Sequence, residues 1–218
     1  MKIFKLAIFL TIALFLVPFA HADGGPVNAV FVGVNGANDG QYYVSPYTGT
    51  MNGQPVVLFC DDIINQVTIG QQWQANVTNL GTAINTNQFS NTRYGGVSTS
   101  AVFGNPSLAY SEAAWLTTQF ASHTNDLVSL QYAIWDIMNP GSEPTSYGDT
   151  QMWLNEAAQD YGSINPGNFS ILTNTGPLQL TGQVQEFIVQ TPEPGVLVLL
   201  LCGLLAIAFQ INRNRITA

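Results

Sequence analysis

The stretch GQYYVSPYTGTMNGQPVVLFC, residues 40–60, indicates most directly how this chain folds. Asn52-Gly53 separates two runs rich in β-branched and aromatic residues, and both residues accept the positive φ of a tight primed turn. The stretch therefore predicts a β-hairpin, with strands over 40–51 and 54–60, whose return strand ends at Cys60. Together with the run AVFVGV just before it, the hairpin predicts a β-rich N-terminal half.

The hydrophobic period changes to that of a helix after about residue 107. Apolar residues at spacings of three and four predict three helices in the middle of the chain, over 107–123, 124–140 and 149–162. Short β-like runs follow at 169–173, 178–180 and 184–190. Strands, then helices, then strands describe an α+β domain with segregated helices.

Two polar segments are expected to lack regular structure. Residues 35–40, NGANDG, loosely resemble a calcium-binding loop, but Ala37 occupies a ligand position, so a turn is predicted. The Asn/Thr/Gly-rich segment from about 76 to 106 carries Arg93. It is expected to be a loop that either lies over the functional site or, as the favoured interpretation, forms solvated surface.

The first 22 residues have the layout of a secretory signal peptide. Lys2 and Lys5 precede an apolar run over 6–19, and Ala20-His21-Ala22 completes the pattern, which predicts cleavage after Ala22.

The other end of the chain predicts a C-terminal membrane helix. An apolar run over 195–209 is near the short limit for crossing a bilayer, and Arg213 and Arg215 follow it. These arginines would keep the end in the cytoplasm and the rest of the chain outside.

Residues 192–218 resemble the PEP-CTERM sorting signal of Gram-negative bacteria, on the motif Pro192-Glu193-Pro194, an apolar helix and a short basic end. The resemblance implies processing by an exosortase-type enzyme. The protein would be held in the inner membrane by its C-terminal helix before processing, then passed to the cell surface or the extracellular matrix.

The remaining segment, 23–191, is long enough for one domain with a substantial core. The chain has 13 acidic and 5 basic residues, but within 23–191 Arg93 is the one lysine or arginine. Such an acidic surface repels nucleic acid and anionic lipid, which are therefore excluded as partners.

Cys60 has no partner for an intramolecular disulfide, because Cys202 lies in the predicted membrane helix. A leftover cysteine in an oxidising compartment is an intermolecular bridge, a buried inert thiol or a reactive group. His123 is the candidate base for a Cys-His hydrolase, which is disfavoured. Too few cysteines and histidines are present for a transition-metal site, and a calcium site at Asp61 and Asp62 is also disfavoured.

The chain resembles the thioester domains of bacterial surface proteins at two motifs, LFCDD (58–62) and LQYAIW (130–135). In that family a cysteine at the end of a strand bonds to the glutamine of a Thr-Gln-x-Ala-Ile-Trp motif, and Leu130 here replaces the usual threonine. The resemblance implies a Cys60-Gln131 thioester and a thioester-domain fold over 23–191.

Three neighbouring side chains are expected to support this site. Trp135 lies one helical turn after Gln131 and would shield the bond from water. Asp61 and Asp62 would raise the pKa of the thiol, and one of them would help to deprotonate an incoming amine. The alternative for these aspartates is a strand-end turn in which they cap the backbone.

The sequence thus predicts an exported surface or matrix protein that captures an amine- or hydroxyl-bearing partner, a polysaccharide or a protein, through the Cys60-Gln131 thioester. It would not be a turnover enzyme, because the acyl group is spent once, and no cofactor or metal is expected. The alternative is a non-covalent structural or binding component of the polysaccharide matrix.

Overall fold

The computed structural model describes residues 25–141, 147–190 and 203. The predicted signal peptide, 1–22, lies outside them, as does the predicted sorting segment, 192–218, apart from Gly203. Among the described residues, no helix has the length and apolar character needed to cross a membrane.

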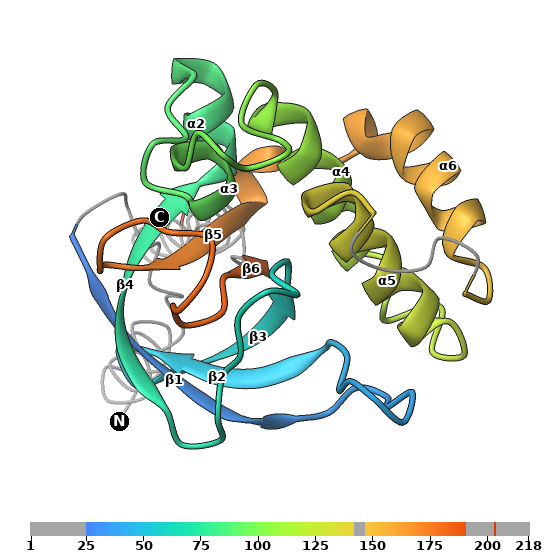
Figure 1. Ribbon diagram of the computed structural model, residues 1–218, viewed down its shortest axis with the longest axis horizontal. Coiled ribbons are helices and arrows are strands. Elements are labelled where there is room, and N and C mark those ends of the chain that lie inside the picture. The colour runs from blue at the N-terminus through green and yellow to red at the C-terminus, as the bar shows by residue number, and fades with distance from the viewer. Residues whose placement is uncertain (1–24, 142–146, 191–202, 204–218) are drawn as a thin grey trace, which may run out of the picture. The chain divides into compact units, whose positions relative to one another are not determined.

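The strands form a closed antiparallel barrel (Figure 1). Its strands follow one another around the barrel in the order β1-β2-β3-β6-β5-β4. Their bounds are β1 Val27–Val34, β2 Tyr47–Met51, β3 Gln54–Cys60, β4 Gln72–Asn79, β5 Phe169–Asn174 and β6 Phe187–Gln190. The last two strands come from the C-terminal part of the chain. The helices within residues 80–160 are therefore inserted between β4 and β5.

The predicted hairpin is confirmed. Met51 pairs with Gln54 across a two-residue turn, in which Asn52 has φ 48° and Gly53 φ 79°. The first strand of the hairpin is shorter than expected, because β2 begins at Tyr47 and the residues before it form an irregular loop over 35–46.

The apolar run that ends at Cys60 is explained by a strand buried on both faces. Successive side chains of a strand point to opposite faces, so Leu58 and Cys60 pack inside the barrel whereas Phe59 packs outside it. Phe187 and Ile188 of β6 divide between the two faces in the same way. A strand with two apolar environments shows a continuous run rather than an alternating pattern.

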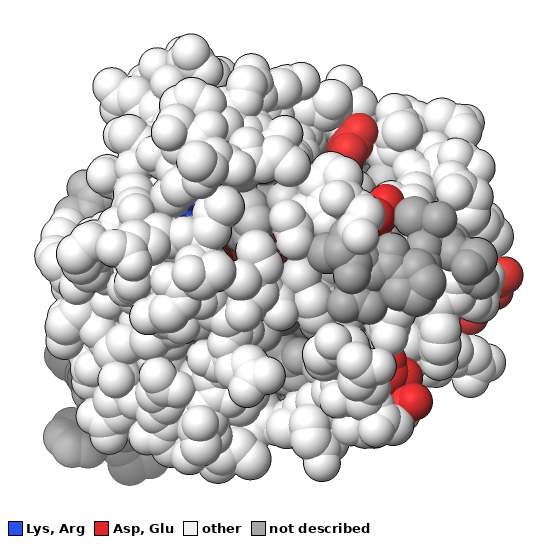
Figure 2. All heavy atoms as spheres, viewed as in Figure 1, with Lys and Arg blue, Asp and Glu red and all other residues white. Residues whose placement is uncertain are grey.

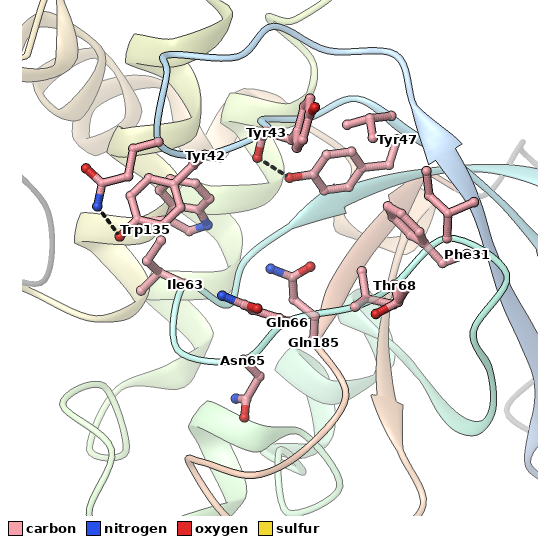
Figure 3. Close-up of a pocket in the computed structure, with 14 residues that line it drawn as sticks. Phe31, Tyr42, Tyr43, Tyr47, Ile63, Asn65, Gln66, Thr68, Trp135 and Gln185 are labelled. Carbon is pink, nitrogen blue, oxygen red and sulfur yellow. Dashed lines mark hydrogen bonds between the residues drawn. The ribbon is translucent and has the colours of Figure 1, made fainter.

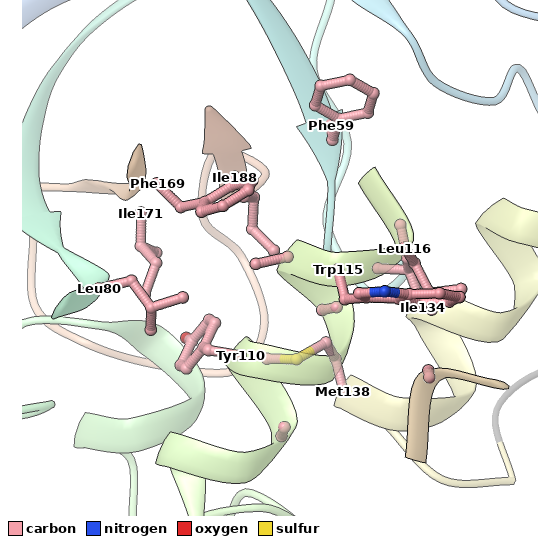
Figure 4. Close-up of a cluster of buried hydrophobic side chains, with 14 of the residues drawn as sticks. Phe59, Leu80, Tyr110, Trp115, Leu116, Ile134, Met138, Phe169, Ile171 and Ile188 are labelled. Carbon is pink, nitrogen blue, oxygen red and sulfur yellow. The ribbon is translucent and has the colours of Figure 1, made fainter. Parts of the chain in front are cut away.

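The outer environment is made by helices. Figure 1 shows α4, α5 and α6 together on one side of the barrel, with α2 and α3 near β4 and β5. Figure 4 shows Phe59, Phe169 and Ile188 of the strands in one cluster with Trp115, Leu116 and Ile134 of the helices. The helices are α2 Leu80–Thr86, α3 Arg93–Gly96, α4 Pro106–Thr117, α5 Leu127–Met138 and α6 Thr150–Asp160, with short 3-10 turns at Tyr161–Ser163 and Pro166–Asn168.

The prediction of a loop over 76–106 is wrong in part, because this segment contains the end of β4 and the helices α2 and α3. Some of its polar residues are helix caps: the side chain of Asn79 accepts a hydrogen bond from the N–H of Thr82, and that of Thr92 from the N–H of Gly95. Capping residues and loop residues have the same composition, which is why the segment resembled a loop. Arg93 is fully buried and does not form solvated surface.

Two other segments differ from the prediction. The helix expected over 107–123 ends at Thr117, where the hydroxyls of Thr117 and Thr118 donate to helical carbonyls three residues earlier, at 2.7 Å each. Residues 178–180 form no strand, and the carbonyl of Leu180 accepts instead from the side chain of Asn65. The predicted α+β class is confirmed.

Candidate functional site

The two residues of the predicted thioester are brought together from different layers of the fold. Cys60 ends β3 on the inside of the barrel, and Gln131 lies on α5. The side-chain Nε2 of Gln131 donates to the backbone carbonyl of Cys60 at 2.6 Å. Both residues are fully buried. The carboxamide therefore lies next to the cysteine in a site from which water is excluded.

Ser45 completes this group, and sequence reasoning missed it. Its backbone N–H donates to Oε1 of Gln131 at 3.0 Å, and its hydroxyl oxygen accepts from the N–H of Cys60 at 2.8 Å. Ser45 is itself fully buried. Nothing in its local sequence marks it, because its role depends on where the 35–46 loop places its backbone.

The position of the 35–46 loop is fixed by contacts within the loop and by a contact with α5. A Cβ on Gly36 would lie 1.8 Å from the carbonyl oxygen of Val44, so only glycine allows this close approach. Asp39 accepts from the N–H groups of Gln41 and Tyr42, at 2.7 and 2.6 Å, and from the hydroxyl of Tyr132 on α5. The turn lies at 39–42, where the N–H of Asp39 donates to the carbonyl of Tyr42, so it overlaps the turn predicted over 35–40 only in part.

Trp135 contacts the sulfur directly, as the spacing on the helix predicted. Its indole Nε1 donates to the Sγ of Cys60 at 3.3 Å, and its side chain is 1% exposed. The ring of Tyr42 packs edge-on against it, with centroids 5.5 Å apart. Trp135 therefore contacts the thiol, and Tyr42 packs against Trp135.

The thiol is held in its neutral form. Burial raises the pKa of Cys60 well above its ordinary value, and the charge of Asp62 raises it further, while the hydrogen bond from Trp135 opposes the shift. The Sγ–H donates to the carbonyl oxygen of Asp62 at 3.4 Å. A resting thiol of this kind resists oxidation, because the thiolate is the reactive species.

Asp62 occupies a charged cluster on the other side of the strand end. It forms an ion pair with Arg93, and both side chains are fully buried. Its Oδ1 also accepts from the N–H groups of Ile64 and Asn65 at 3.1 and 3.2 Å, and from the hydroxyl of Tyr94 at 3.1 Å. The predicted strand-end turn capped by an aspartate is therefore present.

Glu186 is the third acid of this cluster, beside Asp61 and Asp62, and no local sequence pattern predicted it there. It accepts from the backbone N–H of Arg93 at 2.7 Å, from the hydroxyl of Tyr110 at 2.6 Å and from that of Thr173. Burial raises its pKa, although Arg93 opposes the shift.

Asp61 is fully buried, and neither of its carboxyl oxygens has a hydrogen-bond partner among the described residues. Burial raises the pKa of Asp61 well above its ordinary value, and the charges of Glu186 and Asp62 raise it further, while Arg93 lowers it. Three buried carboxyls share one arginine, and Asp61 is the one without stabilising donors. Burial therefore favours the neutral form of Asp61.

A pocket of about 420 Å³ opens beside Trp135 at one end of the barrel (Figure 3). It lies between the 35–46 loop and the segment 63–69, and β1 and β2 contribute further to its wall. Trp135 belongs both to the pocket wall and to the contact with the Cys60 sulfur. Trp135 thus links the pocket to the Cys60-Gln131 pair.

His123 takes part in a different region. Its Nδ1 lies 3.0 Å from the hydroxyl of Ser122 and 3.1 Å from the carbonyl of Gln119, and its ring packs edge-on against Trp153. No hydrogen bond between described residues joins it to Cys60. In the described part of the chain, no three His, Cys, Asp or Glu side chains are grouped so that they could hold a metal ion.

Comparison with protein-family models and with curated proteins found no match. Among solved structures, the fold is similar to the N-terminal domain of the Streptococcus pyogenes pilus tip adhesin Cpa, with 12% sequence identity and a TM-score of 0.44. The similarity covers 80% of this chain and 97% of that domain. At this level of similarity, the chemistry of the site has to be inferred from its own residues.

Proposed function

We propose that Cys60 and Gln131 form an internal thioester, and that the protein is an exported surface or matrix protein that uses it to capture a partner bearing an amine or a hydroxyl. One observation carries the proposal: the carboxamide of Gln131 is held between the carbonyl of Cys60 and the N–H of Ser45 in a fully buried site. Export and surface sorting are supported by the signal peptide and PEP-CTERM patterns of the sequence.

The neighbouring groups suit each step of thioester formation. The sulfur of Cys60 adds to Cδ of Gln131, negative charge develops on Oε1, and the Ser45 N–H that bonds this oxygen stabilises the charge. The C–N bond then breaks. The nitrogen leaves as ammonia, carrying the proton that the thiol gives up, so that an S–C bond replaces the C–N bond.

The same groups suit capture. The Ser45 N–H continues to polarise the acyl carbonyl, and the indole N–H of Trp135 stabilises the sulfur as it leaves. An amine that attacks the carbonyl carbon forms an amide with the side chain of residue 131 and returns the proton to Cys60 as a free thiol. A hydroxyl gives an ester in the same way.

Asp61 is not required as a proton carrier in these steps. Burial favours its neutral form, it has no hydrogen-bond donor to hold it among the described residues, and it follows Cys60 directly in the chain. Its side chain, however, faces the cluster with Arg93 and Glu186, so the proton of an attacking amine passes to the departing sulfur instead.

Intact mass tests the proposal. The wild-type protein should be lighter than its sequence requires by one ammonia, and comparison with the Cys60→Ser variant in the same processed form makes the result independent of where the ends are cleaved. Gln131→Ala should lose the deficit and free Cys60, whereas Gln151→Ala, an exposed glutamine on α6, should keep it. A wild-type protein of full mass, with a thiol that titrates after unfolding, would overturn the proposal.

Capture has its own readout. Methylamine should add to the wild-type protein, expose one thiol per chain and label the peptide that contains Gln131. The label should be missing from Cys60→Ser. Labelling of that variant would show that the methylamine reacts elsewhere.

A further inference from the structure

We infer that the pocket beside Trp135 is a docking site for a neutral saccharide, whose hydroxyl groups it brings to the Cys60-Gln131 pair. The reaction after docking rests on the proposed function, but the binding step itself does not require a thioester. Three features carry the inference: the character of the pocket wall, the exposure of Tyr43 and the connection of the pocket to Cys60 through Trp135.

The wall of the pocket has no charged side chain. The chain as a whole is strongly acidic, yet none of the acidic residues in the part of the chain that the structure describes lines this pocket. A cationic ligand would therefore find no counter-charge, and an anionic ligand would find no cation. In the view of Figure 2, the acidic side chains that reach the surface lie mainly at one side, and most of the face is uncharged. The pocket thus favours a neutral ligand.

Aromatic rings and amides make up much of this wall. Figure 3 shows the side chains of Gln66 and Gln185 between the pair Tyr42 and Trp135 and the ring of Phe31. An amide group carries both donors and an acceptor, which matches the dual character of a sugar hydroxyl. An aromatic face offers an apolar surface on which the C–H face of a sugar ring can pack. This combination suits a polyhydroxylated ring better than a purely apolar side chain.

Part of this surface is open to solvent. Tyr43 is 62% exposed, and its hydrogen bond to Tyr47 uses only its backbone carbonyl, so its ring is available to a ligand. Gln66 is also exposed. A large exposed aromatic residue beside a pocket of several hundred Å³ is typical of a binding site rather than of inert surface.

The pocket leads toward the reactive pair. Tyr42 packs against Trp135, and Trp135 donates to the sulfur of Cys60. The loop that carries Tyr42 and Tyr43 also carries Ser45, which contacts both Cys60 and Gln131. A ligand that contacts Tyr42 and Tyr43 therefore contacts the same loop that positions the carboxamide.

The test is a glycan array probed with the full-length Cys60→Ala variant in a detergent without a sugar headgroup. The array carries neutral, anionic and cationic oligosaccharides together with a lysine-rich peptide. We expect binding to neutral glycans, and a loss of affinity of at least tenfold, measured by calorimetry on the best neutral glycan, in the variant that also has Tyr43→Ala. Tyr161→Ala, an exposed tyrosine after α6, is the matched control and should bind like its parent.

Two results would overturn the inference: no neutral glycan binds in a Tyr43-dependent manner, or the lysine-rich peptide alone does so, which would make the pocket a site for cations. Wild-type protein treated with methylamine replaces the Cys60→Ala variant if that variant does not fold. A missing thioester is detected separately. The wild-type protein would then have its full mass, and glycan binding would be unchanged.

Discussion

Cys60 and Asp61 are neighbours in the chain, yet their side chains enter two different buried environments. The groups that hydrogen-bond Cys60 are neutral: Ser45, Gln131, Trp135 and the backbone carbonyl of Asp62, although the carboxylate of Asp62 raises the pKa of the thiol from farther away. Charge does not have to be balanced there. A neutral network of this kind can hold a reactive group over a wide range of pH.

The environment of Asp61 is charged and incompletely paired. Arg93 is the one cation for three buried carboxyls, those of Asp61, Asp62 and Glu186. Burying a charge is costly unless it is paired, so this cluster must keep a proton. The comparison separates two tasks at the end of one strand: Cys60 faces a site arranged for chemistry, and Asp61 faces a cluster whose stability depends on protonation.

The largest expected effect on stability comes from removing the positive charge of Arg93. Arg93→Met leaves Asp62 buried without its ion-pair partner and removes the positive charge near Glu186, and we expect a loss of about 3–5 kcal/mol in the free energy of unfolding. Urea denaturation measures it. The double variant Arg93→Met/Asp62→Asn should lose less than the single one, because it removes both charges of the pair. A single variant within about 1 kcal/mol of wild type, the value of an exposed pair, would contradict a buried ion pair here.

A pH dependence of stability should follow from the raised pKa values of Asp61 and Glu186. Because these two groups hold protons in the folded state that the unfolded chain has released, their contribution to stability should be greatest below the ordinary carboxyl pKa, about pH 4, and should fall as the pH rises. The slope is at most about 1.4 kcal/mol per pH unit for each proton.

Asp61→Asn tests which acid holds the proton. The variant cannot titrate at this position, so its stability should fall less steeply with rising pH than that of the wild type, in urea denaturation between about pH 5 and 8. Asp160→Asn, an exposed acid, is the matched control and should keep the wild-type slope. An unchanged slope in Asp61→Asn would place the proton on another group.

A smaller effect is expected in the neutral environment. Ser45→Ala leaves the buried N–H of Cys60 without its acceptor, which should cost about 1–3 kcal/mol in urea denaturation. The backbone N–H that bonds Gln131 remains, so the predicted mass deficit of one ammonia should persist. Ser122→Ala removes an exposed hydroxyl and should change neither quantity. Loss of the deficit in Ser45→Ala would assign the side chain, rather than the backbone, to the chemistry.

The sequence predicted those parts of the fold that local patterns determine. The Asn52-Gly53 turn requires positive φ at both positions, and few other dipeptides accept it, so the hairpin was predictable. Gln131 and Trp135 were predictable as neighbours on one face of a helix. Their contact with Cys60 was suggested only by the resemblance to thioester domains, because no local pattern relates a strand end to a helix about 70 residues later.

The missed residues act through the tertiary fold. Ser45 binds Gln131 through its backbone, and a backbone N–H is present at every residue except proline. Arg93 was assigned to solvated surface, because a single arginine in a polar segment usually lies there. Its burial depends on Asp62 and Glu186, which lie in parts of the chain that only the closed barrel brings together.

The smallest expected effect on stability is also the sharpest test of the neutral environment. Trp135→Phe keeps an aromatic ring over Cys60 but removes the indole N–H that bonds its sulfur. One lost neutral hydrogen bond should cost only about 0.5–1.5 kcal/mol in unfolding. Under the proposed mechanism the same bond stabilises the departing sulfur, so methylamine should react roughly two- to tenfold more slowly, followed by the appearance of the free thiol. A faster reaction would mean that Trp135 acts mainly as a cover that keeps nucleophiles out, since the smaller ring would admit them. The control is Trp153→Phe, in the helical cluster, which should leave the rate unchanged.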